Sequence, residues 1–338
     1  MRIAIVNDLP MATEVLRRAV LLHEQYEIAW AAADGAEAVE MCARDTPDLV
    51  LMDLIMPKMN GVQATREIMK QCPCAILVVT SSVNENAAMV FEAMGVGALD
   101  AVDTPALGTS ALETVSAPLL AKLHSMHRLL GFNDPSKVQS RPEPRGAQAT
   151  APLVVIGASA GGPAALAEVL GHLPGDFPSP VVIVQHVDEQ FAPLLVAWMK
   201  QQSVLPVRAA CEGDVPRLGE VLMADRGEHL VMLNARRLGY RHEPKDAFYV
   251  PSVDVFFQSV AQRWPGEVVG VLLTGMGRDG AKGLKSLRDA GFHTIAQDKA
   301  SCAVYGMPKA AAELGAAVEV LPLQSIAAAL CQRCLSRK

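Results

Sequence analysis

The sequence lacks the features of secreted and membrane-spanning proteins. Residues 2–6 already form an apolar, strand-like segment. The charged region, the long apolar stretch and the small-residue cleavage site that together mark a signal peptide do not occur there. No uninterrupted apolar run is long enough to cross a bilayer. These absences predict a cytoplasmic protein without direct membrane insertion.

Disulfide-rich and zinc-binding classes are also disfavoured. The seven cysteines are odd in number and scattered through 338 residues, which does not fit a disulfide framework. Cys331 and Cys334 form a CxxC pair, but no second Cys or His pair stands at a spacing that would complete a zinc site. We therefore expect two reduced thiols on a terminal helix.

Neither half of the chain has a marked excess of positive charge. Residues 1–130 contain 9 Lys and Arg against 16 Asp and Glu, and the remaining residues contain 21 against 20. A nucleic-acid-binding protein normally carries a basic excess on the binding domain. We therefore expect no nucleic-acid partner.

The sequence does contain a repeated alternation of strand-like and helix-like segments. Apolar strand candidates of the first half lie at 2–6, 27–32, 48–52, 75–80 and 98–102. Those of the second half lie at 152–157, 180–185, 220–223, 229–233, 268–273, 293–296 and 317–321. This alternation predicts an α/β protein with two doubly wound parallel-sheet domains. Between them, residues 131–150 show no apolar periodicity and are rich in Pro, Gly and Ser. We place the domains at 1–125 and 151–338, with a linker at 126–150.

Polar residues stand where strand candidates of the first half end. Asn7 and Asp8 follow the first strand, Asp53 follows the third, and Thr80 ends the fourth. In a parallel sheet these ends lie side by side. Acidic residues are common in loops, but carboxylates gathered from several strand ends repel one another and usually need a cation.

Residues 1–125 resemble a response-regulator receiver domain, most closely in DLVLMDLIMPKMNG at 48–61. The resemblance implies a flavodoxin-like fold in which Asp53 accepts a phosphoryl group from a histidine kinase. It also implies Mg²⁺ held by Asp8, Asp53 and the backbone carbonyl of Ile55, with Thr80 as the switch hydroxyl.

The sequence departs from the receiver pattern at three positions. Asn7 stands where the family usually has a second acidic residue, Thr104 where it has a Lys, and Ala101 where it has an aromatic residue. The missing ammonium group would normally pair with the phosphoryl oxygens. We expect Asp53 to be phosphorylated nevertheless, with an altered rate, lifetime or conformational coupling.

The segment VVIGASAGGPAAL at 154–166 admits two interpretations. As a phosphate-binding loop it is defective, because Ser159 and Pro163 stand where a dinucleotide fingerprint needs Gly and a P-loop needs Lys. As a G-x-S-x-G turn it places Ser159 between a strand and the N–H groups of a helix N-terminus. A plain strand-to-helix cap would give the same pattern.

A serine nucleophile needs a base, and the base needs an orienting carboxylate. His186 follows the strand candidate at 180–185, and Asp279 lies in a glycine-rich turn after 268–273. Each residue alone fits a capping or turn role. At three strand ends of one parallel sheet they predict a Ser159–His186–Asp279 triad that needs no metal. The order Ser…His…Asp differs from that of α/β-hydrolases.

The second half resembles the catalytic domain of CheB-type protein-glutamate methylesterases. Similar segments occur in order: VVIGASAGGP, VQHVDEQF, PSVDVFF, VLLTGMGRDGAKGL and AQDKASCAVYGMP. The resemblance implies a Rossmann-like domain that hydrolyses γ-glutamyl methyl esters on the cytoplasmic part of methyl-accepting receptors, with Gln deamidation as a related reaction. The N–H of Ala160, directly after the nucleophile, is a natural oxyanion donor. The resemblance implies Met276 N–H as the second.

The resemblance further implies that the receiver covers the esterase cleft until Asp53 is phosphorylated. The segments IVNDLP and GALDAVDTPAL are similar to the WspF branch, which serves surface signalling. Two other classes of function stay open. One is a non-catalytic adaptor or phosphate sink for a chemosensory kinase. The other is a transcription factor, which the near-neutral second half disfavours.

Overall fold

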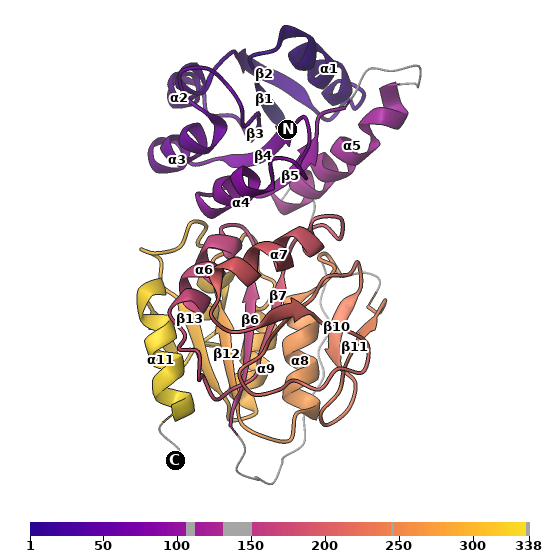
Figure 1. Ribbon diagram of the computed structural model, residues 1–338. Helices are drawn as coiled ribbons and strands as arrows, with labels where there is room; N and C mark the ends of the chain where they lie inside the picture. Colours follow the sequence, from indigo (N-terminus) through magenta and orange to yellow (C-terminus); the bar gives the residue numbers. More distant parts are fainter. Residues whose placement is uncertain (106–111, 131–150, 245–246, 336–338) are drawn as a thin grey trace. The chain divides into compact units, whose positions relative to one another are not determined.

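The computed structural model describes residues 1–105, 112–130, 151–244 and 247–335 (Figure 1). The chain divides into two compact units, one ending at residue 137 and the other beginning at 138. Residues 131–150 of the predicted linker lie outside the described residues, and residues 126–129 form the last turn of a helix. The predicted boundaries at 125 and 150 stay predictions.

The first unit is a five-stranded parallel sheet in the order β2-β1-β3-β4-β5, which is the flavodoxin-like order. Its strands are β1 (Arg2–Val6), β2 (Glu27–Ala32), β3 (Leu49–Met52), β4 (Ala75–Thr80) and β5 (Asp100–Asp103). Its helices are α1 (Pro10–Val20), α2 (Gly35–Arg44), α3 (Gly61–Gln71), α4 (Ala87–Gly95) and α5 (Leu112–Leu129).

Strands β1 to β4 begin within one residue of their predicted starts, whereas β5 begins two residues after the predicted start at 98. Strands β3 and β4 are buried along their whole length, which explains their unbroken apolar pattern. Local signals set the helix starts. Pro10 occupies the first turn of α1, where its missing N–H leaves no helical hydrogen bond unmade. Asn60 and Gln63 form a reciprocal capping box at α3.

The second unit is built on a seven-stranded parallel sheet in the order β14-β13-β12-β6-β7-β9-β8. Its strands are β6 (Leu153–Ala158), β7 (Val181–Gln185), β8 (Val207–Ala209), β9 (Val221–Met223), β12 (Val268–Leu272), β13 (His293–Gln297) and β14 (Glu319–Leu321). Its helices are α6 (Gly162–Gly171), α7 (Ala192–Gln202), α8 (Val253–Arg263), α9 (Ala281–Asp289), α10 (Met307–Glu313) and α11 (Leu323–Leu335).

Helices cover both faces of this sheet. Helix α6 packs with α7 and α11, whereas α9 packs with α8 and α10 (Figure 1). An extensive apolar cluster of this unit joins α8 and α9 to the central strands through Phe256, Phe257, Leu272 and Leu284. Cys331 and Cys334 lie on α11 as free thiols. No helix in the described parts of the chain is long and apolar enough to cross a membrane.

One predicted strand belongs to a different sheet. Residues 229–233 were expected in the parallel sheet, but β10 (His229–Met232) pairs antiparallel with β11 (Leu238–Arg241) in a separate hairpin. Five residues separate the two strands, a loop length typical of hairpins rather than of parallel crossovers. This hairpin contacts α8 and so stands beside the main sheet.

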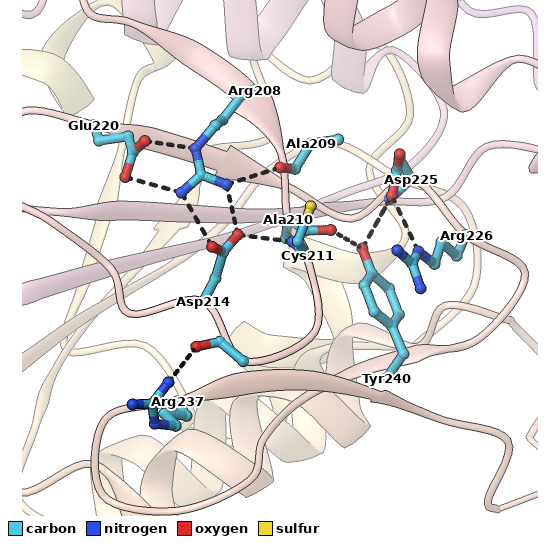
Figure 2. A network of polar contacts seen from close by, with 11 residues as sticks. Arg208, Ala209, Ala210, Cys211, Asp214, Glu220, Asp225, Arg226, Arg237 and Tyr240 are labelled. Carbon is cyan, nitrogen blue, oxygen red and sulfur yellow. Dashed lines mark hydrogen bonds and ion pairs between the residues drawn. The ribbon is translucent and has the colours of Figure 1, made fainter.

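Strand β8 was not predicted, and its only charged residue explains why. Arg208 donates from Nε to Glu220 at 2.6 Å and from Nη1 to Asp214 at 2.5 Å, so its charge is neutralised at the sheet edge (Figure 2). Tyr240 of β11 donates its hydroxyl to the Ala210 carbonyl at 3.1 Å and thereby ties the hairpin to the residues after β8.

Candidate active site

Three of the predicted residues lie at the point where the strand order of the second sheet reverses. Strand β6 pairs with β7 on one side and with β12 on the other. Ser159 directly follows β6, His186 directly follows β7, and Asp279 lies in the loop after β12. Ligands and reacting groups of doubly wound sheets gather at such switch points, at the carboxyl ends of the strands.

The turn at Ser159 depends on two glycines. Gly161 adopts φ +75° at the start of α6, a backbone conformation that favours glycine. Gly275, after β12, lies so close that a Cβ there would stand 2.8 Å from Ser159 Cβ. Ser159 N–H donates to the Thr274 carbonyl at 3.0 Å, which fixes the serine against the residues after β12.

Gln185 connects the ends of β6 and β7. Its buried side-chain amide donates to the Ser159 carbonyl at 2.8 Å and to the His186 carbonyl at 2.9 Å. Gln185 was not among the predicted site residues. The one feature of the sequence that could have indicated it is a polar side chain at the last position of an otherwise apolar strand.

His186 and Asp279 form a nearly buried pair. Nε2 of His186 lies 2.8 Å from Oδ2 of Asp279, and each side chain is 9% exposed. Burial disfavours the charged carboxylate, but hydrogen bonds from His186, Val253 N–H and Ser252 outweigh this effect and lower the pKa of Asp279. An ionised carboxylate only accepts hydrogen bonds, so Nε2 carries the imidazole hydrogen and Nδ1 carries the lone pair. Nδ1 is buried, with no hydrogen-bond partner in the described part of the chain.

The N-terminus of α8 holds the Asp279 carboxylate in place. Oδ1 accepts the Ser252 hydroxyl at 2.8 Å and the Asp254 N–H at 3.2 Å, and Oδ2 accepts the Val253 N–H at 2.7 Å. Ser252 also caps α8 by accepting from Val255 N–H. The motif PSVDVFF drew attention to this segment, but the sequence did not reveal that it supports Asp279.

Two amide groups beside Ser159 are available as donors. Neither Ala160 N–H nor Met276 N–H donates to another of the described residues, whereas the amides just before them, those of Ser159 and Gly275, donate to the carbonyls of Thr274 and Val304. Ala160 directly precedes the αL residue at the start of α6, and Met276 directly follows Gly275. Ser159 Oγ and His186 are not hydrogen-bonded to each other within the described regions. Such a contact often tightens only when substrate binds.

In the first unit, Asp53 stands directly after β3 and accepts hydrogen bonds from the backbone and from Asn7. The Asn7 side-chain amide donates to Oδ2 of Asp53 at 3.1 Å, and the Leu54 N–H donates to Oδ1 at 2.7 Å. Burial, together with the charge of Asp8, raises the pKa of Asp53, although the amides of Leu54 and Ile55 oppose the shift. The Asn7 position therefore supplies a hydrogen-bond donor to Asp53 instead of a second negative charge.

The other predicted receiver residues lie on β4 and after β5. Thr80 is 1% exposed, and its hydroxyl accepts from the Asn86 amide at 3.1 Å. Thr104 N–H donates to the Thr80 carbonyl at 2.8 Å, and Ala101 is buried in β5. The hydrogen bonds to the Asp53 carboxylate come from Asn7 and the Leu54 N–H, and no ion pair joins it to a basic side chain among the described residues. In this part of the chain, no cationic group therefore takes the place of the Lys that the family has at position 104.

The predicted metal ligands fit Mg²⁺ chemically. Asp8 is close enough to Asp53 for its charge to raise the Asp53 pKa, so the two carboxylates destabilise each other unless a cation lies between them. Two carboxylate groups and a backbone carbonyl are the oxygen ligands that Mg²⁺ prefers.

Comparison with known proteins matches the two parts of the chain separately. The family described as CheB methylesterase matches residues 154–330, and the response regulator receiver domain matches residues 3–113. A Mesorhizobium japonicum protein named protein-glutamate methylesterase/protein-glutamine glutaminase is 54% identical over 336 residues, or 99% of both chains. A Pseudomonas aeruginosa protein named protein-glutamate methylesterase/protein-glutamine glutaminase 3 is 56% identical over 98% of this chain and 99% of the relative.

A solved structure resembles the second unit. The crystal structure of the Thermotoga maritima CheB methylesterase catalytic domain has a TM-score of 0.52 and 35% sequence identity. The similarity covers 54% of this chain and 99% of that one.

Proposed function

The chain belongs to the CheB methylesterase family, and we propose that it hydrolyses glutamate methyl esters on the cytoplasmic part of methyl-accepting chemosensory receptors. The names of its relatives extend the proposal to deamidation of receptor glutamines. A histidine kinase is the proposed phosphodonor of its receiver domain. The WspF-like branch and the cytoplasmic location stay predictions.

The proposed chemistry rests on one observation, the 2.8 Å contact that leaves the lone pair of His186 on Nδ1. Ser159 Oγ attacks the ester carbonyl while Nδ1 takes the serine proton. His186 then gives this proton to the methoxide, which leaves as methanol, and Asp279 stabilises the imidazolium. Water releases the glutamate carboxylate from the acyl-enzyme by the same proton transfers.

The tetrahedral intermediate carries a negative oxygen that needs fixed donors. Ala160 N–H and Met276 N–H are the proposed pair, because both are unengaged beside Ser159 in the described region. Water is the only co-reactant, so the esterase site requires no cofactor in this proposal.

The proposed test is methanol release from a methylated receptor. Ser159→Ala should abolish release while the thermal unfolding midpoint stays close to that of the unmodified protein. Ser286→Ala on α9 is a matched control, since within the described regions that hydroxyl donates to the Lys282 carbonyl of its own helix and to no residue of the site. Turnover retained by Ser159→Ala would contradict the assignment. Loss of turnover in both variants would point to general damage instead.

For the receiver, we propose that Asp53 is the phosphoryl acceptor and that Asp8, Asp53 and the Ile55 carbonyl hold Mg²⁺. Bound there, Mg²⁺ would neutralise charge on the incoming phosphoryl group. Thr80 is the proposed switch hydroxyl, and its partner Asn86 would have to release it during switching. Phosphorylation should raise the esterase rate of the full chain by relieving inhibition by the receiver.

This regulatory proposal is tested by incubating the full chain with a cognate kinase, ATP and Mg²⁺. Both the phosphoryl label and the rise in methanol release should disappear in Asp53→Ala. Label without any change in turnover would favour the competing function, a phosphate sink. A full chain with no esterase activity in either state would favour the non-catalytic adaptor.

A further inference from the structure

Tyr249 lies face to face with the imidazole of His186. The ring centroids are 4.0 Å apart and the planes are inclined by only 10°. Tyr249 belongs to the segment between β11 and α8, the same segment that ends at Ser252. One stretch of chain therefore contacts both members of the His186–Asp279 pair, Tyr249 through the imidazole face and Ser252 through the carboxylate.

The hydrogen bond to Asp279 does not fix the imidazole plane by itself. It holds one atom, Nε2, which lies close to the axis of the Cβ–Cγ bond, so the ring can still turn about that bond. A turn of this kind would move the Nδ1 lone pair away from the position that a serine proton must reach. A second flat ring stacked on the imidazole prevents the turn, because the two faces would collide.

The hydroxyl of Tyr249 makes no contact with the described residues that would explain the stacked position of the ring. Tyr249 Oη is buried and has no hydrogen-bond partner in the described parts of the chain. Burial, with a smaller effect from the Asp279 charge, raises the pKa of Tyr249, so the ring stays neutral over the working range. A neutral aromatic face carries partial negative charge and attracts a cation above it.

From these observations we propose that Tyr249 is a positioning residue for His186. Its ring holds the imidazole plane, and its face stabilises the imidazolium that forms while the serine proton is transferred. The inference rests on the proposed function, because it requires His186 to be the base. It assigns the effect to the aromatic ring and none of it to the hydroxyl.

The test compares two variants in the methanol-release assay. Tyr249→Leu removes the ring but keeps the site apolar, and kcat should fall about tenfold, the scale of a partly desolvated cation–π contact. KM should change less than twofold. The acidic limb of the pH–activity profile should move to lower pH, since a less stable imidazolium forms only at a higher proton concentration. Tyr249→Phe keeps the ring and should match the unmodified protein in kcat and in pH profile.

Controls separate this effect from damage to the segment. Val250→Ala trims the next residue of the same segment, whose side chain is 44% exposed, and should leave kcat within about twofold. If Tyr249→Leu does not fold, Tyr249→Met fills a similar volume without a flat ring and replaces it. Unmodified kcat and pH profile in the Leu or Met variant would overturn the proposal. An equal loss in Tyr249→Phe would also overturn it, because the hydroxyl would then be responsible. Ser159→Ala, assayed alongside, shows separately whether the proposed function itself fails.

Discussion

Replacing Asp279 with Asn tests the site most directly, because the change keeps the shape and removes the charge. The four donors around the carboxylate divide evenly: Ser252 and Asp254 N–H meet Oδ1, while His186 and Val253 N–H meet Oδ2. An Asn side chain offers one oxygen and one NH₂ group, so two of these donors must face a nitrogen.

Both orientations of the amide are damaging. With nitrogen at the Oδ2 position, His186 must turn its lone pair toward Asn, so that Nδ1 carries the hydrogen and cannot act as a base. With nitrogen at the Oδ1 position, Ser252 can rotate its hydroxyl, but Asp254 N–H loses its acceptor. A buried N–H without a partner costs about 1–3 kcal/mol of stability. Without the carboxylate charge, kcat should fall about 10⁴-fold, or about 5 kcal/mol in activation free energy.

The assays are initial rates of methanol release and urea unfolding. Asp289→Asn is the matched control, because that carboxylate is 52% exposed at the end of α9 and pairs with Lys285. It should change neither quantity measurably. If Asp279→Asn keeps kcat within about tenfold of the unmodified protein, the carboxylate does not stabilise an imidazolium and the mechanism is wrong.

Three further predictions concern close packing, pH and the missing lysine. Gly275→Ala would place a Cβ in collision with Met307 Sδ and 2.8 Å from Ser159 Cβ, so both side chains must shift and kcat should fall about 100-fold in a folded protein, as methanol release and circular dichroism would show. Burial disfavours ionised Asp214, but Arg208 and the Cys211 amide outweigh it and lower the Asp214 pKa. This pair therefore stabilises the fold above the unfolded pKa of about 4 and loses that effect as the pH falls. Urea titrations from about pH 5 to pH 3 should show a steeper loss in the unmodified protein than in Arg208→Gln. Thr104→Lys should speed kinase labelling by about tenfold through a charge-assisted bond to the phosphoryl group, and an unchanged rate would contradict that role.

The sequence was sufficient for the parts of the fold that depend on local patterns. Runs of buried apolar residues predicted β1 and β4 to the residue, since parallel strands covered on both faces are apolar throughout. Strands β8 and β11 were not found, because each combines a short length with residues that interrupt an apolar run, as Gly239 and Arg241 do in β11. At β8 the pattern is also broken by Arg208, whose partners stand 6 and 12 residues further along the chain.

In the candidate site, too, some residues could be predicted from the sequence and others could not. Ser159, His186 and Asp279 could be proposed because each ends or follows a recognisable strand, and parallel strand ends converge. The contacts that support them come from side chains that are distant in the sequence. Ser252 donates to Asp279, 27 residues away, and Tyr249 stacks on His186, 63 residues away. No periodicity encodes such contacts, so only the folded arrangement reveals them.

The N–H and hydroxyl donors at the start of α8 also determine which of two buried carboxyl groups, Asp254 or Asp279, carries the negative charge. Burial, with the charge of Asp279, raises the pKa of Asp254 to about 7, although its Oδ1 accepts from Gly283 N–H at 2.6 Å. Asp279 has four donors directed at it and a lowered pKa. Two such groups close together cannot both ionise easily, so the better-bonded one takes the charge. The donors at α8 therefore do more than hold Asp279 in place, because they keep the negative charge next to His186, where the imidazolium forms.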